Sequence, residues 1–187
     1  MTIYARSTGP GVAGIAIIRI SGSDVLRVIK SLTGKEIPKP RMATLRKINY
    51  INTSELIDEG IIIWFPGPES YTGEDMAEIH IHGGKAGVLA VQNEISKIKN
   101  CRLAEPGEFT KLAFQNGKIN LLKAESIGDL ISAETEIQRL QAVKIMSGQS
   151  SDKFNELREK LLKLLSFVEA KIDFPEEDLP VENLKKI

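Results

Sequence analysis

The sequence predicts an α+β protein, in which a mixed β-sheet with packed helices is followed by long α-helices. Two observations support this fold class. Strand-like and helix-like segments alternate through the first half of the chain, which is typical of a sheet covered by helices. After about Leu121 the apolar residues recur only at helical spacing. We therefore expect an N-terminal domain at residues 1–120 and a helical part at residues 121–187.

Apolar residues at periods of two and of 3.6 locate the elements of the first half. The strands are expected at 3–6, 14–20, 43–50, 57–65 and 77–82, and the helices at 23–32 and 85–98. The apolar stripe of the first helix consists of Val25, Val28, Ile29 and Leu32. The run 61–65 is apolar on both faces, which predicts a central strand, and the Pro-Gly-Pro sequence after it stops that strand.

The second half predicts two long amphipathic helices. We expect the first to run unbroken to Gly148, with an apolar stripe of Leu122, Ile127, Leu130, Ile131, Ile137, Leu140 and Met146. The second begins near 150–152 and ends before Pro175, with apolar residues Phe154, Leu157, Leu161, Leu164, Val168 and Ile172. The tail 175–187 has no core pattern of its own, so we expect a portion of a longer protein. An authentic short relative is the alternative.

Composition and charge exclude several classes of protein. The 187 residues are 42% hydrophobic and carry 25 basic and 25 acidic side chains, so bulk charge does not indicate a nucleic-acid partner. The single cysteine, Cys101, has no second thiol for a disulfide or a redox pair, and we interpret it as a passive thiol. No signal-peptide pattern is visible, and no window reaches the roughly 18 apolar residues of a membrane span. We expect a cytoplasmic protein.

The segment 77–84 is the most informative part of the chain. The two-residue period of a strand sends Glu78, His80 and His82 to one side, while the apolar residues between them pack on the other. Gly83 and Gly84 then allow a tight turn or a close approach to a ligand. A binding site at this strand is the favoured interpretation. A zinc or iron site made of the carboxylate and the two imidazoles is the alternative.

Two basic residues accompany this strand. Arg19 lies in an apolar strand, on the same face as Ile15 and Ile17, where an unpaired charge would be costly. It either forms a structural salt bridge or faces an anion with its planar set of donors. Lys118 follows a turn-forming Asn-Gly pair and would by itself be interpreted as a surface lysine.

Neither nucleotide-binding motif is present in its proper context. Glycines at 9, 11 and 14 match G-x-G-x-x-G, but they precede a strand, whereas the dinucleotide motif opens a helix. The three Gly-Lys pairs are followed by Glu36, Ala86 and Ile119, where a P-loop requires Ser or Thr. We expect the glycines at 9–14 to form a flexible loop beside a different kind of site.

Four segments carry a resemblance to a known family: GIAIIRISG, WFPGPESYTGEDMAEIHIHGG, AEPGEFTKLAFQNGKINLLKAES and VEAKIDFPEE. Together they resemble the amino-terminal part of the MnmE (TrmE) family of tRNA-modification GTPases over residues 3–177. The resemblance implies a domain like the tetrahydrofolate-binding domain of the glycine-cleavage aminomethyltransferase. Such a domain forms the homodimer and holds 5-formyl-tetrahydrofolate, the one-carbon source, near the dimer interface. The implied folate contacts are Arg19, Glu78 and Lys118.

The chemistry of the ligand suits these residue types. A reduced pterin offers adjacent N–H donors that a carboxylate such as Glu78 can accept as a pair, and an anionic glutamate tail suits Arg19 or Lys118. Which cation takes which end of the folate stays open.

The family's remaining properties are expected beyond this chain. Full-length members insert a GTPase domain that uses GTP, magnesium and potassium into the helical domain, so residues 121–187 would be its first helices and would not hydrolyse GTP alone. With the flavoprotein MnmG they modify carbon 5 of the wobble uridine of certain tRNAs. A stand-alone folate-dependent aminomethyltransferase-like protein and a purely structural dimerisation module are the alternatives.

Four positions depart from the family pattern. They are Gly9, in a segment where the family commonly reads Thr-Pro-Pro-Gly, Val12 in place of a basic residue, Leu112 in place of an arginine, and Asn120 in place of an aspartate. We expect these differences to affect the affinity for folate.

Overall fold

The structure, a computed structural model, describes residues 1–173, and the side chains of these residues except 149–151. The predictions for Pro175 and the tail 175–187 lie outside the described residues. Internal contacts divide the chain into two compact units, Met1–Ile119 and Asn120–Ile187. Each unit is described by itself.

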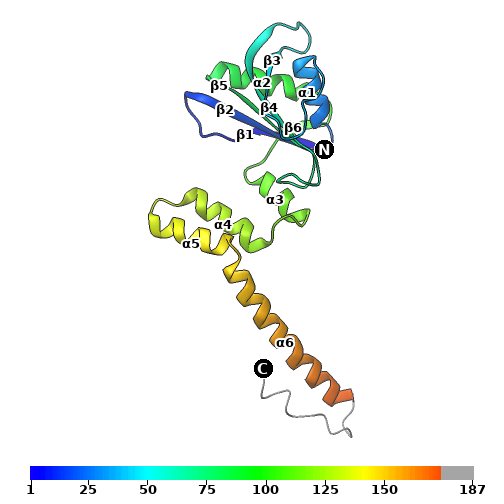
Figure 1. Ribbon diagram of the computed structural model, residues 1–187, viewed down its shortest axis with the longest axis vertical. Helices are drawn as coiled ribbons and strands as arrows, with labels where there is room; N and C mark the ends of the chain where they lie inside the picture. The colour runs from blue at the N-terminus through cyan, green and yellow to red at the C-terminus, as the bar shows by residue number, and fades with distance from the viewer. Residues whose placement is uncertain (174–187) are drawn as a thin grey trace. The chain divides into compact units, whose positions relative to one another are not determined.

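The first unit is built on one six-stranded sheet (Figure 1). Its strands are β1 (Thr2–Arg6), β2 (Ala13–Ser21), β3 (Thr44–Asn49), β4 (Leu56–Phe65), β5 (Met76–Gly83) and β6 (Cys101–Leu103). Their order across the sheet is β3-β4-β5-β2-β1-β6. The β1–β6 pair is parallel and the other pairs are antiparallel. This mixed sheet with packed helices confirms the predicted fold class.

Helices α1 (Val25–Thr33) and α2 (Lys85–Ser96) cover one face of this sheet (Figure 1). Alternate residues of β2 and β5 point toward them, because successive side chains of a strand face opposite sides. The four residues predicted for the stripe of α1 are fully buried. The core contains Ala16, Ile18 and Ile20 of β2, Ile79 and Ile81 of β5, and Val88, Val91 and Ile95 of α2. Each large side chain buried here contributes about 1.5–3 kcal/mol of hydrophobic free energy.

The opposite face of the sheet is covered less completely. Ile61 of β4 is 38% exposed and Leu45 of β3 is 62% exposed, whereas Ile62 on the helix side is fully buried. β4 is an interior strand between β3 and β5, as predicted for the run 61–65, but its face that carries Ile61 is partly exposed. Ile61 is therefore partly open to solvent.

Two short elements of the first unit were not predicted. β6 has only three residues and pairs in parallel with β1. Helix α3 (Glu108–Gln115) begins directly after Pro106 and Gly107. It approaches the less covered face of the sheet, because the ring of Phe109 lies beside Arg19 of β2.

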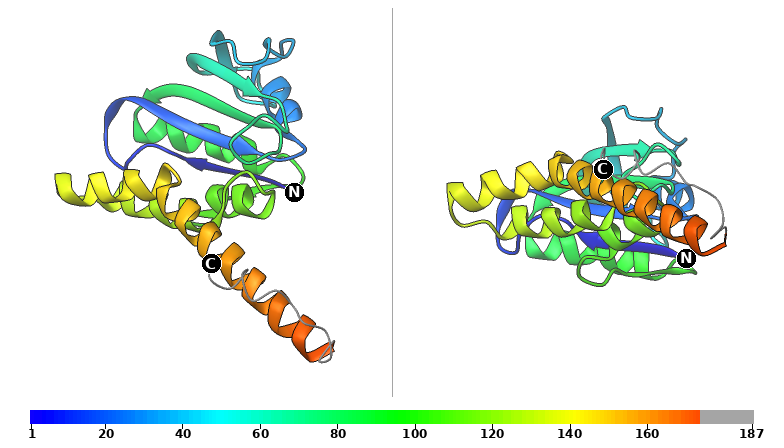
Figure 2. Two further views of the ribbon diagram at one scale, coloured as in Figure 1. Left: turned by 60° about the horizontal axis from the view of Figure 1, so that its bottom comes forward. Right: turned by 90° about the horizontal axis from the view of Figure 1, so that it is seen from below.

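The second unit contains helices α4 (Leu121–Ser132), α5 (Glu136–Met146) and α6 (Gln149–Asp173). Figure 2 shows α4 and α5 side by side as a hairpin. The predicted unbroken helix to Gly148 is therefore wrong, because the chain turns at Thr135. The Thr135 side chain accepts a hydrogen bond from the Gln138 N–H, and the Gln138 side chain bonds back to the Thr135 N–H. This reciprocal capping box starts a new helix.

Gly148 marks the boundary between α5 and α6, as predicted for the end of the preceding helix. Its φ of +97° lies in the region that favours glycine. Within residues 1–173, no helix is both long and apolar enough to cross a lipid bilayer.

Candidate functional site

Arg19 and Glu78 form an ion pair across the two central strands. The two residues are register partners on β2 and β5. Arg19 donates from Nη2 and Nε to Oε1 of Glu78, at 2.8 and 3.1 Å. The side chains are 30% and 16% exposed, on the face away from α1 and α2. The structure therefore contains the salt bridge that was one of the two interpretations of Arg19.

The ion pair with Glu78 uses only some of the N–H donors of Arg19. Its Nη1 group has no hydrogen-bond partner in the part of the chain that the structure describes. A partly exposed guanidinium whose other edge is anchored can still donate to an incoming acceptor. The anion-facing interpretation of Arg19 thus remains chemically compatible with the ion pair.

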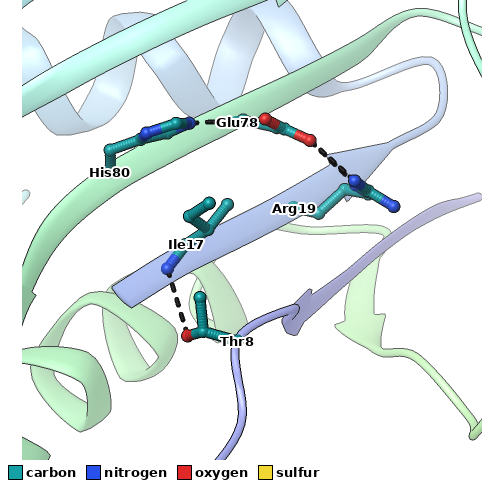
Figure 3. A network of polar contacts seen from close by, with 5 residues as sticks. All are labelled: Thr8, Ile17, Arg19, Glu78 and His80. Carbon is teal, nitrogen blue, oxygen red and sulfur yellow. Dashed lines mark hydrogen bonds and ion pairs between the residues drawn. The ribbon is translucent and has the colours of Figure 1, made fainter. Parts of the chain in front are cut away.

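The second oxygen of Glu78 is bound by His80. Nε2 of His80 lies 3.3 Å from Oε2 of Glu78, and the His80 side chain is 25% exposed. Figure 3 shows the Glu78 carboxylate between the imidazole on one side and the Arg19 guanidinium on the other. Both oxygens of the carboxylate are therefore held by the protein itself.

Two aromatic rings flank the guanidinium of Arg19. The ring centroids of Tyr71 and Phe109 lie 5.7 and 5.8 Å from its Cζ atom, within the range of a cation–π contact. Tyr71 comes from the loop between β4 and β5, and Phe109 comes from α3. The hydroxyls of Tyr71 and Thr110 share a hydrogen bond of 2.9 Å, which ties this loop to α3.

The sequence analysis did not identify Tyr71 or Phe109 as site residues. Because the two residues are far apart along the chain, the sequence does not show that both lie beside Arg19. The available signal was their position inside two of the segments that carry the family resemblance, WFPGPESYTGEDMAEIHIHGG and AEPGEFTKLAFQNGKINLLKAES.

Lys118 is positioned by the turn that ends α3. Gly117 adopts a φ of +69°, and the Lys118 N–H donates to the Ala113 carbonyl at 2.9 Å, as in a Schellman motif. The aliphatic part of Lys118 lies against Gly73, where an added Cβ would be 3.2 Å from its Cγ. Lys118 is exposed and has no ion-pair partner within the described residues. Its charge is available to an anion.

The loop 66–75 connects Lys118 to the ion pair. Asn116, beside Lys118, donates from Nδ2 to the Thr72 carbonyl at 2.7 Å. The Thr72 hydroxyl shares a buried hydrogen bond of 2.7 Å with that of Ser21, two residues from Arg19 on β2. The structure thus brings Arg19 and Glu78 into direct contact and sets Lys118 against the same loop. Among residues 1–173, no hydrogen bond or ion pair joins Lys118 directly to Arg19 or Glu78.

His82 has a different partner from His80. Its backbone N–H donates to Oδ2 of Asp58 at 2.9 Å, and its Nδ1 lies 2.8 Å from Oδ1. Burial of the Asp58 carboxyl favours its neutral form, but the hydrogen bonds from His82 outweigh burial and lower the pKa of Asp58. Within the described residues, no group of three or more His, Cys, Asp or Glu side chains could hold a metal ion. The alternative metal triad is not assembled there.

The glycine-rich segment is the connection between β1 and β2. It is followed by a strand, as the sequence indicated, and Arg6 of β1 donates to the Gly11 carbonyl at 3.0 Å. Among the departures from the family pattern, Val12 in this loop is 92% exposed. Asn120 caps α4 by accepting a hydrogen bond from the Lys123 N–H at 2.8 Å.

Comparison with known proteins gives the family. Residues 2–118 match the family model described as the GTP-binding protein TrmE N-terminus, and residues 121–187 match the MnmE helical domain. The chain belongs to the MnmE (TrmE) family. The resemblance found in the sequence is thereby confirmed.

Individual relatives agree with this assignment. The chain is 77% identical over 187 residues to the tRNA modification GTPase MnmE of Pelagibacter ubique, covering 100% of this chain and 42% of that protein. It is 48% identical over 179 residues to the MnmE of Rickettsia akari, covering 96% of this chain and 40% of the relative. For Parvibaculum lavamentivorans MnmE the identity is 43% over 186 residues, with coverage of 100% and 42%. The chain therefore spans about two fifths of the length of these relatives.

Proposed function

We propose that this chain binds 5-formyl-tetrahydrofolate through Arg19, Glu78 and Lys118. The observation that carries the proposal is that Arg19, which is paired with Glu78, contacts Tyr71 of the loop 66–75, and that Lys118 lies against Gly73 of the same loop. The sheet lies in the segment matched by the TrmE N-terminus model. A site on a rigid sheet, bordered by loops, is a common setting for a small ligand.

The chemistry of the donors and acceptors fits a reduced folate. Glu78 supplies a carboxylate for the N–H groups of a pterin, while the free Nη1 of Arg19 and the ammonium of Lys118 suit carbonyl or carboxylate oxygens. The rings of Tyr71 and Phe109 add polarisable surface beside the arginine. We expect the departures from the family pattern at Gly9, Val12, Leu112 and Asn120 to affect the affinity for folate.

The bound folate would serve a larger enzyme. In the full-length protein we infer that this module supplies the one-carbon unit with which a homodimeric GTPase and the flavoprotein MnmG modify carbon 5 of the wobble uridine of tRNA in the cytoplasm. GTP, magnesium and potassium would bind in the GTPase domain, outside this chain. The curated relatives named above are called tRNA modification GTPases, and this chain spans about two fifths of their length.

Exposed apolar residues on one face of the sheet support self-association of the chain. Ile15 and Leu45 are 60% and 62% exposed, and they line a shallow cavity together with Ile61 on the face of the sheet away from α1 and α2. Exposed apolar side chains gathered on one face are typical of a protein interface. We infer that this face takes part in the homodimer, and light scattering of the chain with and without folate tests the inference.

Calorimetric titration with 5-formyl-tetrahydrofolate tests the binding proposal. Arg19→Ala, Glu78→Ala and Lys118→Ala should each weaken binding by the roughly 1.5–3 kcal/mol of a hydrogen bond to a charged group. Lys99→Ala is the matched control, because Lys99 is an exposed lysine in the turn after α2. Unchanged titration curves for the three site variants would refute the proposed contacts. Absence of binding by the wild-type chain would favour the purely structural dimerisation module.

A further inference from the structure

The hydrogen bonds of Glu78 leave little of its carboxylate free. A carboxylate offers about four acceptor positions, two on each oxygen. Arg19 fills both positions on Oε1 with its Nη2 and Nε donors, and His80 takes one position on Oε2. One position on Oε2 is left. A ligand that donates two N–H groups to Glu78 can be accepted only if one of the existing donors is released.

His80 and Arg19 hold the carboxylate in different ways. The two bonds from Arg19 converge on the single atom Oε1, so by themselves they leave the carboxylate free to turn about that atom. The contact from His80 reaches Oε2 and fixes the orientation of the carboxylate plane (Figure 3). The free acceptor position of Oε2 therefore points in a direction that depends on His80.

The His80 side chain is not part of the hydrophobic core. Its side chain lies on the face away from α1 and α2, is 25% exposed, and bonds to Glu78 two residues earlier on the same strand. The antiparallel pairing of β5 with β2 and β4 is made by backbone groups and does not need the imidazole. His82, on the same face of β5, bonds to Asp58 instead of Glu78.

We propose that His80 is a positioning residue for the folate site, which donates its Nε2–H to Oε2 of Glu78 and thereby orients the acceptor that receives the pterin N–H. The inference rests on the proposed folate-binding function. It excludes the neutral tautomer that is protonated only at Nδ1, because a carboxylate can only accept and Nε2 must therefore carry a proton. Loss of the imidazole lets the carboxylate rotate, and ligand binding must then order it.

The test uses the full 187-residue chain and three variants. His80→Leu removes the donor, His80→Gln keeps an N–H of similar reach, and His82→Leu removes the neighbouring imidazole that does not contact Glu78. In calorimetric titrations with 5-formyl-tetrahydrofolate, His80→Leu should weaken binding about two- to tenfold, the range expected for ordering one side chain. His80→Gln and His82→Leu should stay within about twofold of the wild-type affinity, and all variants should remain folded at the titration temperature, because no core contact changes.

The experiment distinguishes a failure of the positioning role of His80 from a failure of folate binding itself. If the wild type binds folate and His80→Leu binds equally well, or His80→Gln loses as much affinity as His80→Leu, the positioning role is overturned while folate binding stands. A nitrogen–proton correlation spectrum of the wild-type imidazole provides a readout without ligand. The Nε2–H tautomer at neutral pH supports the inference. The Nδ1–H tautomer overturns it, and absence of folate binding by the wild type overturns both the inference and the proposed function.

Discussion

Replacement of Glu94 is the most demanding test of the packing between helix α2 and the sheet. Glu94 is 1% exposed, and its Oε2 accepts a hydrogen bond of 3.0 Å from the backbone N–H of Ile51, in the turn between β3 and β4. Its other oxygen pairs with Lys97, one turn further along the helix. The carboxylate therefore fastens α2 to a turn of the sheet. We expect Glu94→Ala to break this connection.

The expected cost follows from these contacts. A hydrogen bond to a charged group contributes about 1.5–3 kcal/mol. The side chain of Lys97 is 52% exposed, so solvent screens the ion pair and limits it to about 0.2–1 kcal/mol. Glu94→Ala should therefore lower the free energy of unfolding by about 2–4 kcal/mol. Glu94→Gln keeps an acceptor for the Ile51 N–H and should cost roughly half as much, since a neutral hydrogen bond is about half as strong.

The pH dependence of this effect has a definite sign. Burial of the Glu94 carboxyl opposes ionisation, but the hydrogen bond from Lys97 and that from the Ile51 N–H outweigh burial and lower its pKa below the ordinary value of 4.5. A group with a lowered folded pKa stabilises the protein above its unfolded pKa and loses that contribution as the pH falls through the folded pKa. The advantage of wild type over Glu94→Gln should be constant near neutrality and shrink below pH 4.5.

Urea unfolding followed by tryptophan fluorescence measures these differences. The only tryptophan, Trp64, packs against the core of the first unit and reports its unfolding. A cost of less than about 0.5 kcal/mol for Glu94→Ala, the size of an ordinary surface substitution, would refute the reasoning. A wild-type advantage over Glu94→Gln that grows as the pH falls would refute the assigned sign.

Two other substitutions follow from local geometry. A Cβ at Gly60 would lie 2.1 Å from the backbone oxygen of His80, so Gly60→Ala should destabilise the first unit by at least about 2 kcal/mol in the same urea assay. A Cβ at Gly87 in α2 would meet no atom within 4 Å, so Gly87→Ala should instead stabilise the first unit by about 0.5–1 kcal/mol. Equal changes in the free energy of unfolding for Gly60→Ala and Gly87→Ala would contradict this packing. Thr135→Ala removes the capping box with Gln138 and should cost about 1 kcal/mol, seen as faster hydrogen exchange in α5, and unchanged exchange would count against the cap.

The periodicity of the sequence predicted the larger elements well. The strands and helices of the first 98 residues agree with the structure to within a few residues at each end. The reason is that an element with one buried face repeats its apolar residues every two positions in a strand or every 3.6 positions in a helix. The apolar stripe of Val25, Val28, Ile29 and Leu32 is fully buried for this reason.

The failures also have physical causes. β6 has three residues and α3 has eight, so neither is long enough to show a period. The break between α4 and α5 was missed because apolar residues continue at helical spacing on both sides of it. The spacing of Thr135 and Gln138 was a readable capping-box signal that would have located the break.

The candidate site could be predicted only in part. The face shared by Glu78 and His80 follows from a single strand, whereas the contact between Arg19 and Glu78 depends on β2 and β5 being neighbours in the sheet. Strand order is a property of the whole fold and is not readable from local period. The approach of Tyr71 and Phe109 to Arg19 depends in addition on a loop and a short helix that local pattern does not specify.

A crystal structure of the chain with 5-formyl-tetrahydrofolate at saturating concentration tests the central claim most directly. The account predicts ligand density on the face of the sheet away from α1 and α2, within hydrogen-bonding distance of Glu78, Arg19 and Lys118. It also predicts that the pterin donates to Oε2 of Glu78, the oxygen with a free acceptor position. Density elsewhere on the molecule, or a ligand that touches none of these three residues, would contradict the account.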